Sequence, residues 1–432
     1  MSRWKKLSMV SLCCLLVATA TTVCAQDDEA ALKAAQKAAQ IEQWRVDLDH
    51  PKFAVRNRAV RGLRLSGELA VPALVEAASG DSREASHRAF VVLCEFVASQ
   101  NERVAASAHR ALLELLTAES MRVVREAEQI LTWRDEKMRE RAIGEIERLG
   151  GEVQLRSTPN GPVSRVSLNS TWTGGDDLKL LLRLKKITWL SLENAAVGNK
   201  AMEVIKQLTD LEYLYLGNTR ISGAALRELK TLRHLRYLSL EGLSLANEGM
   251  DVVGRLPSLE YLGLDSTDFD DTDAKQLERL VKLRTLWLNG TSITDAALKH
   301  LHPCKSLTRL YLEGTDVAGP GLGDLKMLES LDYLSLKNVA VDEESLSSLG
   351  QLTNLHTLGL DHTPTSDAML IHLESLANLR VLWLSKTSVS DAGVDHLAKI
   401  SSLKTVFLHG SKVSDEGAAR LKETLPRCEV HR

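Results

Sequence analysis

Hydrophobic and polar residues follow a 24-residue period from residue 163 to about residue 425. Its apolar part is a Leu-x-x-Leu-x-Leu motif, seen in full at Leu211, Leu214 and Leu216. The motif is repeated eleven times without a slip, and its first apolar positions are Val163, Ile187, Leu211, Leu235, Leu259, Leu283, Leu307, Leu331, Leu355, Leu379 and Leu403. A fixed period of this length predicts a solenoid, in which stacked units share one core.

Each 24-residue unit contains one strand and one helical segment. In Leu-x-Leu the side chains alternate, so the leucines point inward and the residues between them point outward, as a strand requires. A later apolar set, such as Leu298 and Leu301, has the spacing of a helical turn. Thr294, Ser390 and Ser414 precede such segments, where an N-cap is expected. We therefore expect a parallel sheet on the inner side of an arc, roughly 50 Å long for eleven strands at ~4.8 Å each, with helices outside.

Threonine recurs shortly after the strand in six units. A hydroxyl at this place could satisfy backbone groups of a neighbouring coil, so we interpret these residues as structural. They are Thr219, Thr267, Thr291, Thr315, Thr363 and Thr387.

These motifs resemble the leucine-rich repeat family from Val163 to about Leu425, which is well over half of the chain. The stretch Thr-Ser-Ile-Thr-Asp-Ala-Ala-Leu at 291–298 is similar to the ribonuclease-inhibitor-like or GALA-type class, although Thr stands where Asn or Cys is usual. The resemblance implies a ligand-binding horseshoe and supplies no catalytic residues. The expected fold class is thus an α/β solenoid, with a parallel sheet on its concave face and helices on its convex face, preceded by an all-α domain.

Short segments at both ends of the repeats are expected to shield the core. Residues 150–162 contain an extra strand turned back at Pro159-Asn160-Gly161, which predicts a capping hairpin. Eleven repeats then occupy residues 163–425, and residues 426–432 are expected to form a final shielding strand.

Residues 26–149 have apolar residues at helical spacing, for example Phe90, Leu93 and Val97. A helix is expected to open at Phe53 and to break at Ser66-Gly67, and a second helix starts near Pro72. This pair resembles a HEAT-type helical hairpin. The alternative is a plain helical bundle that caps the horseshoe.

Residues 1–25 have the features of a secretory signal peptide: basic residues, an apolar run and the small residue Ala25 at the expected cleavage site. We therefore predict a protein of exported bacterial type, periplasmic or secreted. An uncleaved N-terminal anchor is the alternative, although the run falls short of the ~20 apolar residues of a membrane span. Cys94, Cys304 and Cys428 remain after cleavage and form no disulfide framework; Cys304 replaces a core leucine and is expected to be buried.

Composition excludes some classes of function. The formal net charge of −3 argues against a general nucleic-acid binder. Aromatic residues make up only 4% of the chain, so their positions are informative.

Aromatic residues concentrate at the outward positions beside the central leucine of each strand. Ten of them are found there, including every tyrosine: Trp189, Tyr213, Tyr215, Tyr237, Tyr261, Trp287, Tyr311, Tyr333, Trp383 and Phe407. The residues at 189, 213, 237 and 261 share one position in four consecutive strands and should form a contiguous ladder. An acidic margin runs two outward positions further along, interrupted by Lys337 and His409; it consists of Glu193, Glu241, Asp265, Glu313 and Asp361.

Exposed Tyr and Trp anchor protein partners, so we interpret these aromatic and acidic residues as a partner-binding surface. The alternative is that the rings stack across strands and only stiffen the sheet. The expected function is a non-enzymatic protein-interaction scaffold. The alternative is an envelope carbohydrate-binding protein that uses the same rings.

No catalytic site, metal site or cofactor is predicted. Asp361, Ser385 and His409 lie on adjacent strands, but Ser stands where a triad needs His. His300 and His302 are metal-ligand types near Cys304, yet the cysteine is expected to point into the core.

Overall fold

The computed structural model describes residues 31–159, 161–176, 178–245 and 249–432. The chain forms two compact units that divide between Met138 and Arg139, inside helix α6 (Met121–Arg148). The division therefore falls within the segment that we assigned to the helical domain. The predicted signal peptide lies outside the described residues. Among those residues, no helix is both long enough and apolar enough to cross a membrane.

The first unit is entirely helical in its described part. A helix from residue 31 to residue 47 precedes α2 (Phe53–Ser66), η1 (Gly67–Ala70), α3 (Val71–Ser79), α4 (Arg83–Val97) and α5 (Glu102–Leu115). Gly67 has a φ of 55°, a left-handed conformation that ends α2 where the sequence predicts the break. Leu63, Leu74, Leu93 and Leu112 are completely buried in the core of this unit.

The described residues of the second unit form one sheet, in which thirteen strands follow in chain order. β1 and β2 are antiparallel, and each later strand pairs in parallel with the one before it. The strands are β1 (Glu152–Thr158), β2 (Gly161–Ser167), β3 (Ile187–Ser191), β4 (Tyr213–Tyr215), β5 (Tyr237–Ser239), β6 (Tyr261–Gly263), β7 (Thr285–Trp287), β8 (Arg309–Tyr311), β9 (Tyr333–Ser335), β10 (Thr357–Gly359), β11 (Val381–Trp383), β12 (Thr405–Phe407) and β13 (Glu429–His431).

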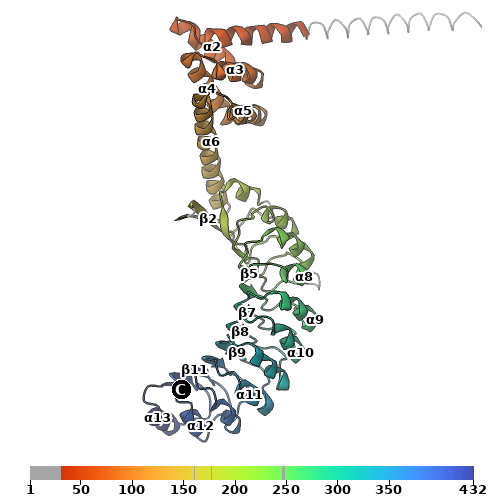
Figure 1. Cartoon of the computed structure of the whole chain (residues 1–432), viewed down its shortest axis with the longest axis vertical. Coiled ribbons are helices and arrows are strands. Elements are labelled where there is room, and N and C mark those ends of the chain that lie inside the picture. Colours follow the sequence, from red (N-terminus) through yellow and green to blue (C-terminus); the bar gives the residue numbers. More distant parts are fainter. Residues whose placement is uncertain (1–30, 160, 177, 246–248) are drawn as a thin grey trace, which may run out of the picture. The chain divides into compact units, whose positions relative to one another are not determined.

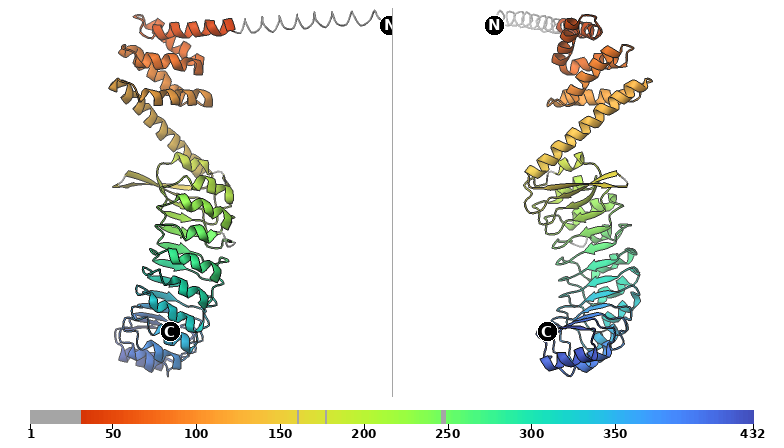
Figure 2. Two further views of the ribbon diagram at one scale, coloured as in Figure 1. Left: turned by 45° about the vertical axis from the view of Figure 1, so that its right-hand side comes forward. Right: turned by 90° about the vertical axis from the view of Figure 1, so that its left-hand side faces the viewer.

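Short helices return the chain from each strand to the next. They are η2 (Lys179–Arg183), η3 (Asn199–Ala201), α7 (Met202–Ile205), η4 (Gly223–Thr231), α8 (Gly249–Val253), α9 (Asp271–Ala274), η5 (Lys275–Arg279), α10 (Asp295–Leu298), η6 (Lys299–Leu301), η7 (Gly319–Met327), α11 (Glu343–Leu349), η8 (Ala368–Leu373), α12 (Val394–Lys399) and α13 (Asp415–Thr424). Figure 1 shows these helices on the outer side of the arc and the strands on its inner side. Figure 2 shows the coils stacked one upon another. The predicted α/β solenoid is confirmed.

A tight bend follows the strand in every repeat from β3 to β12. One residue in each bend has a φ between 54° and 68°, the left-handed region, and these residues again occupy one position of the repeat. They are Asn194, Asn218, Gly242, Ser266, Gly290, Gly314, Asn338, His362, Lys386 and Gly410. Gly and Asn adopt this conformation at low cost, so the bend sets the direction in which the chain leaves the sheet.

The leucines of the repeat fill the interior of the solenoid. Leu214, Leu238, Leu262 and Leu286, from neighbouring strands, are all 0% exposed. Cys304 is also completely buried, as predicted, and its thiol donates to the carbonyl of Leu277. One coil could not bury its leucines alone, so stacking is what stabilises the fold.

The threonines after the strands act within their own coil. The hydroxyl of Thr291 donates to the carbonyl of Leu288 at 2.7 Å, three residues earlier. Thr219, Thr267, Thr315, Thr363 and Thr387 form the same bond. Our expectation that they satisfy a neighbouring coil was therefore wrong, because the bend brings each hydroxyl back to its own strand end.

The first coil of the solenoid is covered by residues of the second unit itself. Ala142 and Ile146, in the last turns of α6, are buried in the same core as Val166 and Leu168. β1 pairs with β2 along its whole length, and most of its side chains are exposed. At the other end β13 extends the sheet, and the adjacent Cys428 is buried.

Candidate binding surface on the concave face

Two rows of side chains point from the strands into the hollow of the arc. The first row holds the residue before the central leucine of each strand, and Trp189, Tyr213, Tyr237 and Tyr261 are directly paired within it. The second row holds the residue after that leucine, for example Tyr215 in β4 and Trp287 in β7. The parallel register thus places equivalent side chains of successive repeats next to one another.

All ten predicted aromatic residues are partly exposed, whereas the leucines between them are buried. In β5, for instance, Leu238 is fully buried and the preceding Tyr237 is half-buried. Alternation along each strand therefore separates a dry interior from a solvent-facing aromatic surface, as the sequence predicts.

The rings form one unbroken chain of contacts from β3 to β12. Successive ring centroids lie 4.6 to 6.1 Å apart along Trp189, Tyr215, Tyr237, Trp287, Tyr311, Tyr333, Trp383 and Phe407. Tyr213 and Tyr261 flank Tyr237 at 6.3 and 5.9 Å. The chain thus crosses repeatedly between the two rows. The predicted ladder holds for the three tyrosines, but the ring of Trp189 contacts Tyr215 in the second row.

Two residues that sequence reasoning missed extend this chain. The guanidinium of Arg165 lies over the ring of Trp189, 4.6 Å from its centroid. At the other end the His431 ring stacks on Phe407 with centroids 4.7 Å apart. Both occupy row positions in the strands that flank the predicted surface, β2 and β13. Continuing the repeat count into those strands would have found them.

Burial raises the pKa of the central tyrosines. Desolvation raises the pKa of Tyr237 far above its usual value, with further contributions from Tyr215 and from the carboxylates of Glu193 and Asp265. Desolvation likewise raises the pKa of Tyr333 to about 12 and raises that of Tyr311. At neutral pH these phenols are therefore uncharged groups that can donate and accept hydrogen bonds.

The acidic margin consists of two kinds of carboxylate. Asp265 accepts from the backbone amide of Asn289 at 2.8 Å, and Asp361 accepts from that of Ser385 at 2.6 Å. Glu313 accepts from the hydroxyl of Ser335. These three carboxylates therefore join neighbouring coils.

Glu193 and Glu241 are partly exposed, and no side-chain bond is found for either carboxylate among the described residues. They lie beside the first part of the ring chain. Burial raises the pKa of Asp265, and the negative charges of Glu241 and Glu313 raise it further, although the bonds from Asn289 oppose this. The N-terminal half of the concave face is thus an aromatic surface with excess negative charge.

The family comparison agrees with this geometry. Residues 220–417 match the model of a leucine-rich repeat region. Over these residues the solenoid is similar to a leucine-rich repeat region. A search of the curated proteins finds no match to this chain.

Leucine-rich repeat proteins are also among the similar solved structures. An internalin of Listeria monocytogenes has 17% identity and a TM-score of 0.42, covering 62% of this chain and 86% of its own. A leucine-rich repeat protein of Leptospira interrogans has 18% identity and a TM-score of 0.35, covering 59% and 80%. A TDR receptor has 18% identity and a TM-score of 0.43, covering 58% of this chain and 43% of its own. Similarity at this level does not bear on the ligand.

The polar residues of the repeat region that could have formed a triad or a metal site are not arranged as one. Asp361 binds the backbone of Ser385 rather than an imidazole. His300 Nδ1 is hydrogen-bonded to Glu278 at 2.6 Å, whereas His302 Nε2 lies 3.3 Å from Asp324 without forming a hydrogen bond. In the part of the chain that the structure describes, no group of three or more His, Cys, Asp or Glu is placed to hold a metal ion.

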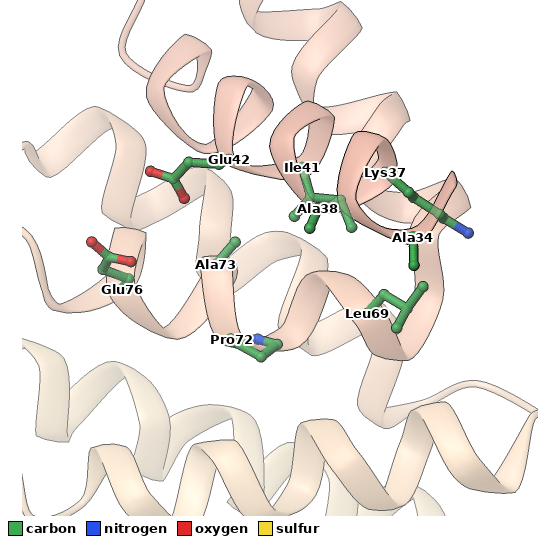
Figure 3. Close-up of a pocket in the computed structure, with 9 residues that line it drawn as sticks. All are labelled: Ala34, Lys37, Ala38, Ile41, Glu42, Leu69, Pro72, Ala73 and Glu76. Atoms are coloured by element: carbon green, nitrogen blue, oxygen red, sulfur yellow. The ribbon is translucent and has the colours of Figure 1, made fainter. Parts of the chain in front are cut away.

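A separate cavity lies in the helical unit. It has a volume of about 320 Å³ and is lined mainly by the helix at 31–47 and by residues at the start of α3. Figure 3 shows Ile41 and Ala38 facing Ala73 and Pro72, with Lys37 and Glu42 directed toward the outside. This is an apolar groove without a cluster of catalytic groups.

Proposed function

We propose that this chain is a non-enzymatic interaction scaffold whose leucine-rich repeat region binds a polypeptide partner on the concave aromatic face. The observation that carries the proposal is the unbroken chain of partly exposed rings from β3 to β12. Tyr and Trp give large contact areas at low entropic cost and dominate the binding energy of protein interfaces. A face of this kind has no role in closing the core, because the leucines on the opposite side of each strand do that.

A carbohydrate ligand is the competing proposal, and the ring geometry speaks against it. A sugar stacks on an aromatic face that is free. Here the rings cover one another: Trp287 and Tyr311, for example, are inclined by only 14° at a centroid distance of 5.6 Å. Ring faces that are covered by a neighbouring ring are not free for a sugar, which favours a polypeptide as the ligand.

Charge supports a partner with basic residues. The partly exposed carboxylates of Glu193 and Glu241 would attract Lys or Arg side chains and steer their approach. The partner would then lie with its basic residues over β3 to β6.

The test is simultaneous substitution of Tyr213, Tyr237 and Tyr261 by Ala in the full chain. We expect capture of partners from an envelope extract to fall at least tenfold, while the circular dichroism spectrum stays unchanged. The matched control is Leu182→Ala with Ile371→Ala, since these exposed apolar residues lie in η2 and η8, away from the strands. Undiminished capture by a folded triple variant would contradict the proposal, and a glycan array on the same proteins would reveal a carbohydrate ligand.

We also propose that the chain is exported. The basic residues and the apolar run before Ala25 support this. N-terminal sequencing of the protein isolated from its source should start at Gln26. A mature chain that starts at its first residues and stays in the cytoplasm would contradict export.

A further inference from the structure

The repeats themselves recur as a group of four. Residues 211–306 and residues 307–402 are identical at 40 of 96 positions. Shifts by one, two and three repeats leave 26, 27 and 35 identities over the same 96 positions. The shift by four repeats therefore gives the highest of these counts, and we compare the concave residues of the two four-coil blocks, or copies, that it defines.

The second row is the same in both copies. Its residues are Tyr215, Ser239, Gly263 and Trp287 in the first copy and Tyr311, Ser335, Gly359 and Trp383 in the second. The first row keeps only one of its four residues, the tyrosine at 237 and 333. We call Tyr215, Tyr237 and Trp287 the first ring cluster, and Tyr311, Tyr333 and Trp383 the second ring cluster.

The two ring clusters have the same geometry. The two tyrosines are 4.6 Å apart at 31° in the first cluster and 4.8 Å apart at 37° in the second. The central tyrosine and the tryptophan are 6.1 Å apart at 54° and 5.9 Å apart at 66°. Burial raises the pKa of the central tyrosine in both.

The small residues of the second row explain how this geometry arises. In the second row of each copy, the tyrosine is followed by Ser and Gly on the next two strands. These two strands therefore carry no bulky side chain in that row. The central tyrosine leans into this gap and reaches the tryptophan two strands away. In the second cluster a Cβ on Gly359 would lie 3.3 Å from the Trp383 ring, whereas a Cβ on Gly263 in the first cluster would have no neighbour nearer than 3.6 Å.

We infer that the concave face carries two copies of one subsite, the first and second ring clusters, which together hold two successive segments of one extended polypeptide. This inference rests on the proposed function. Equivalent residues of the clusters are four strands apart, about 19 Å at 4.8 Å per strand. An extended chain covers that distance in about 6 residues, so the side chains bound by the two clusters lie that far apart in the ligand sequence.

Charge differs between the copies and gives the polypeptide a direction. Glu193 and Glu241 flank the first ring cluster. Lys337 occupies the place of Glu241 in the second copy, 3.8 Å from Glu313. A basic residue of the ligand is therefore stabilised over the first cluster, and its other end lies over the second.

The test begins with selection from a library of random 14-residue peptides on the full chain. We expect selected peptides to carry Lys or Arg toward one end and to bind at a ratio of 1:1. Tyr237→Ala and Tyr333→Ala should each weaken binding at least tenfold. Each half of a selected peptide should bind about 100-fold more weakly than the whole.

The chain offers controls away from the rings and in its own second copy. Leu182→Ala and Ile371→Ala lie in η2 and η8, outside the strands, and should change the affinity less than threefold. Glu241→Lys introduces the residue found at 337 and should weaken binding about fivefold, less so at high salt. Tyr237→Phe and Tyr333→Phe keep the rings and guard against loss of fold.

A second readout follows both clusters at once. In the chain labelled with 5-fluorotryptophan, Trp287→Phe and Trp383→Phe assign the two ¹⁹F signals, and a selected peptide should shift both. If only one signal moves, or only one of Tyr237→Ala and Tyr333→Ala weakens binding, the paired subsites are disproved while peptide binding to the concave face stands. If no peptide depends on either cluster, the proposed function fails too.

Discussion

The interior of the solenoid and its concave face are built from alternate residues of the same strands, yet they follow different periods. The interior follows the 24-residue repeat, with a leucine or its equivalent buried at each central position. The second row of the concave face returns only at every fourth coil, as Tyr, Ser, Gly and Trp. Neighbouring residues such as Leu286 and Trp287 therefore recur with different periods.

The shorter period has a physical cause in folding. Every coil meets its neighbours in the same way, so every coil needs the same apolar shape. Nothing in the stacking requires that a ring on the concave face return only at the fourth coil. The concave residues thus differ from one coil to the next while the buried leucines recur in every coil. Residues that stacking does not determine are the ones available for binding.

The largest effect should come from the interior. Leu286→Ala removes a fully buried side chain and should lower the free energy of unfolding by about 3 kcal/mol, because a cavity remains between coils. Urea denaturation followed by circular dichroism measures this. An equal loss for the neighbouring Trp287→Ala would abolish the distinction between interior and face.

The concave ring should matter less for stability. Trp287→Ala should lower the free energy of unfolding by about 1.5 kcal/mol, since its ring stacks on Tyr311 and contacts Tyr237 but is partly exposed. The same denaturation experiment gives this value. A loss above that of Leu286→Ala would mean that the rings serve mainly to hold the sheet.

Alkaline pH should report on the tyrosines of the face, because their hydroxyl groups titrate in this range. The raised pKa values of Tyr333, about 12, and of Tyr237 mean that the unfolded chain loses these protons first. Their stabilising contribution is complete below pH 10 and is lost as the pH rises through 10 to 12. Denaturation midpoints between pH 8 and 11.5 should fall less steeply in the Tyr237→Phe, Tyr333→Phe variant than in the wild type. Parallel curves would contradict this.

The smallest effect on stability should come from the glycines of the second row, and it should differ between the two copies. Gly359→Ala places a Cβ 3.1 Å from the Ser335 hydroxyl and 3.3 Å from Trp383, and should cost about 1 kcal/mol. Gly263→Ala has no neighbour nearer than 3.6 Å and should stay within about 0.5 kcal/mol of the wild type. Thermal melts of both variants test this order, and a reversed order would show that the gap in the second row is not what positions the tryptophan.

The repeat pattern was sufficient to predict the solenoid, because burial of Leu214 or Leu286 follows from the alternation along a strand. It also placed the N-caps at Thr294 and Ser414, which accept from the amides of Ala296 and Gly417. In such cases the relevant contacts are local or one coil away, and the period determines them.

Details that depend on side-chain direction could not be predicted in the same way. The ring of Trp189 turns to Tyr215 rather than Tyr213, because either row is within reach of a large ring. Asp265 and Asp361 were predicted as part of an acidic recognition margin, yet they accept from backbone amides of the next coil. The repeat period determines the backbone position of a side chain, whereas packing determines which groups that side chain contacts.

Site-specific photocrosslinking tests most directly whether the hollow of the arc is the binding face. p-Benzoylphenylalanine would be placed at Tyr237 on the concave face or at Ile371 on η8, in the cells that produce the chain. The account predicts a discrete crosslinked polypeptide from position 237 and none from position 371. The opposite pattern, or equal crosslinking from both positions, would contradict it.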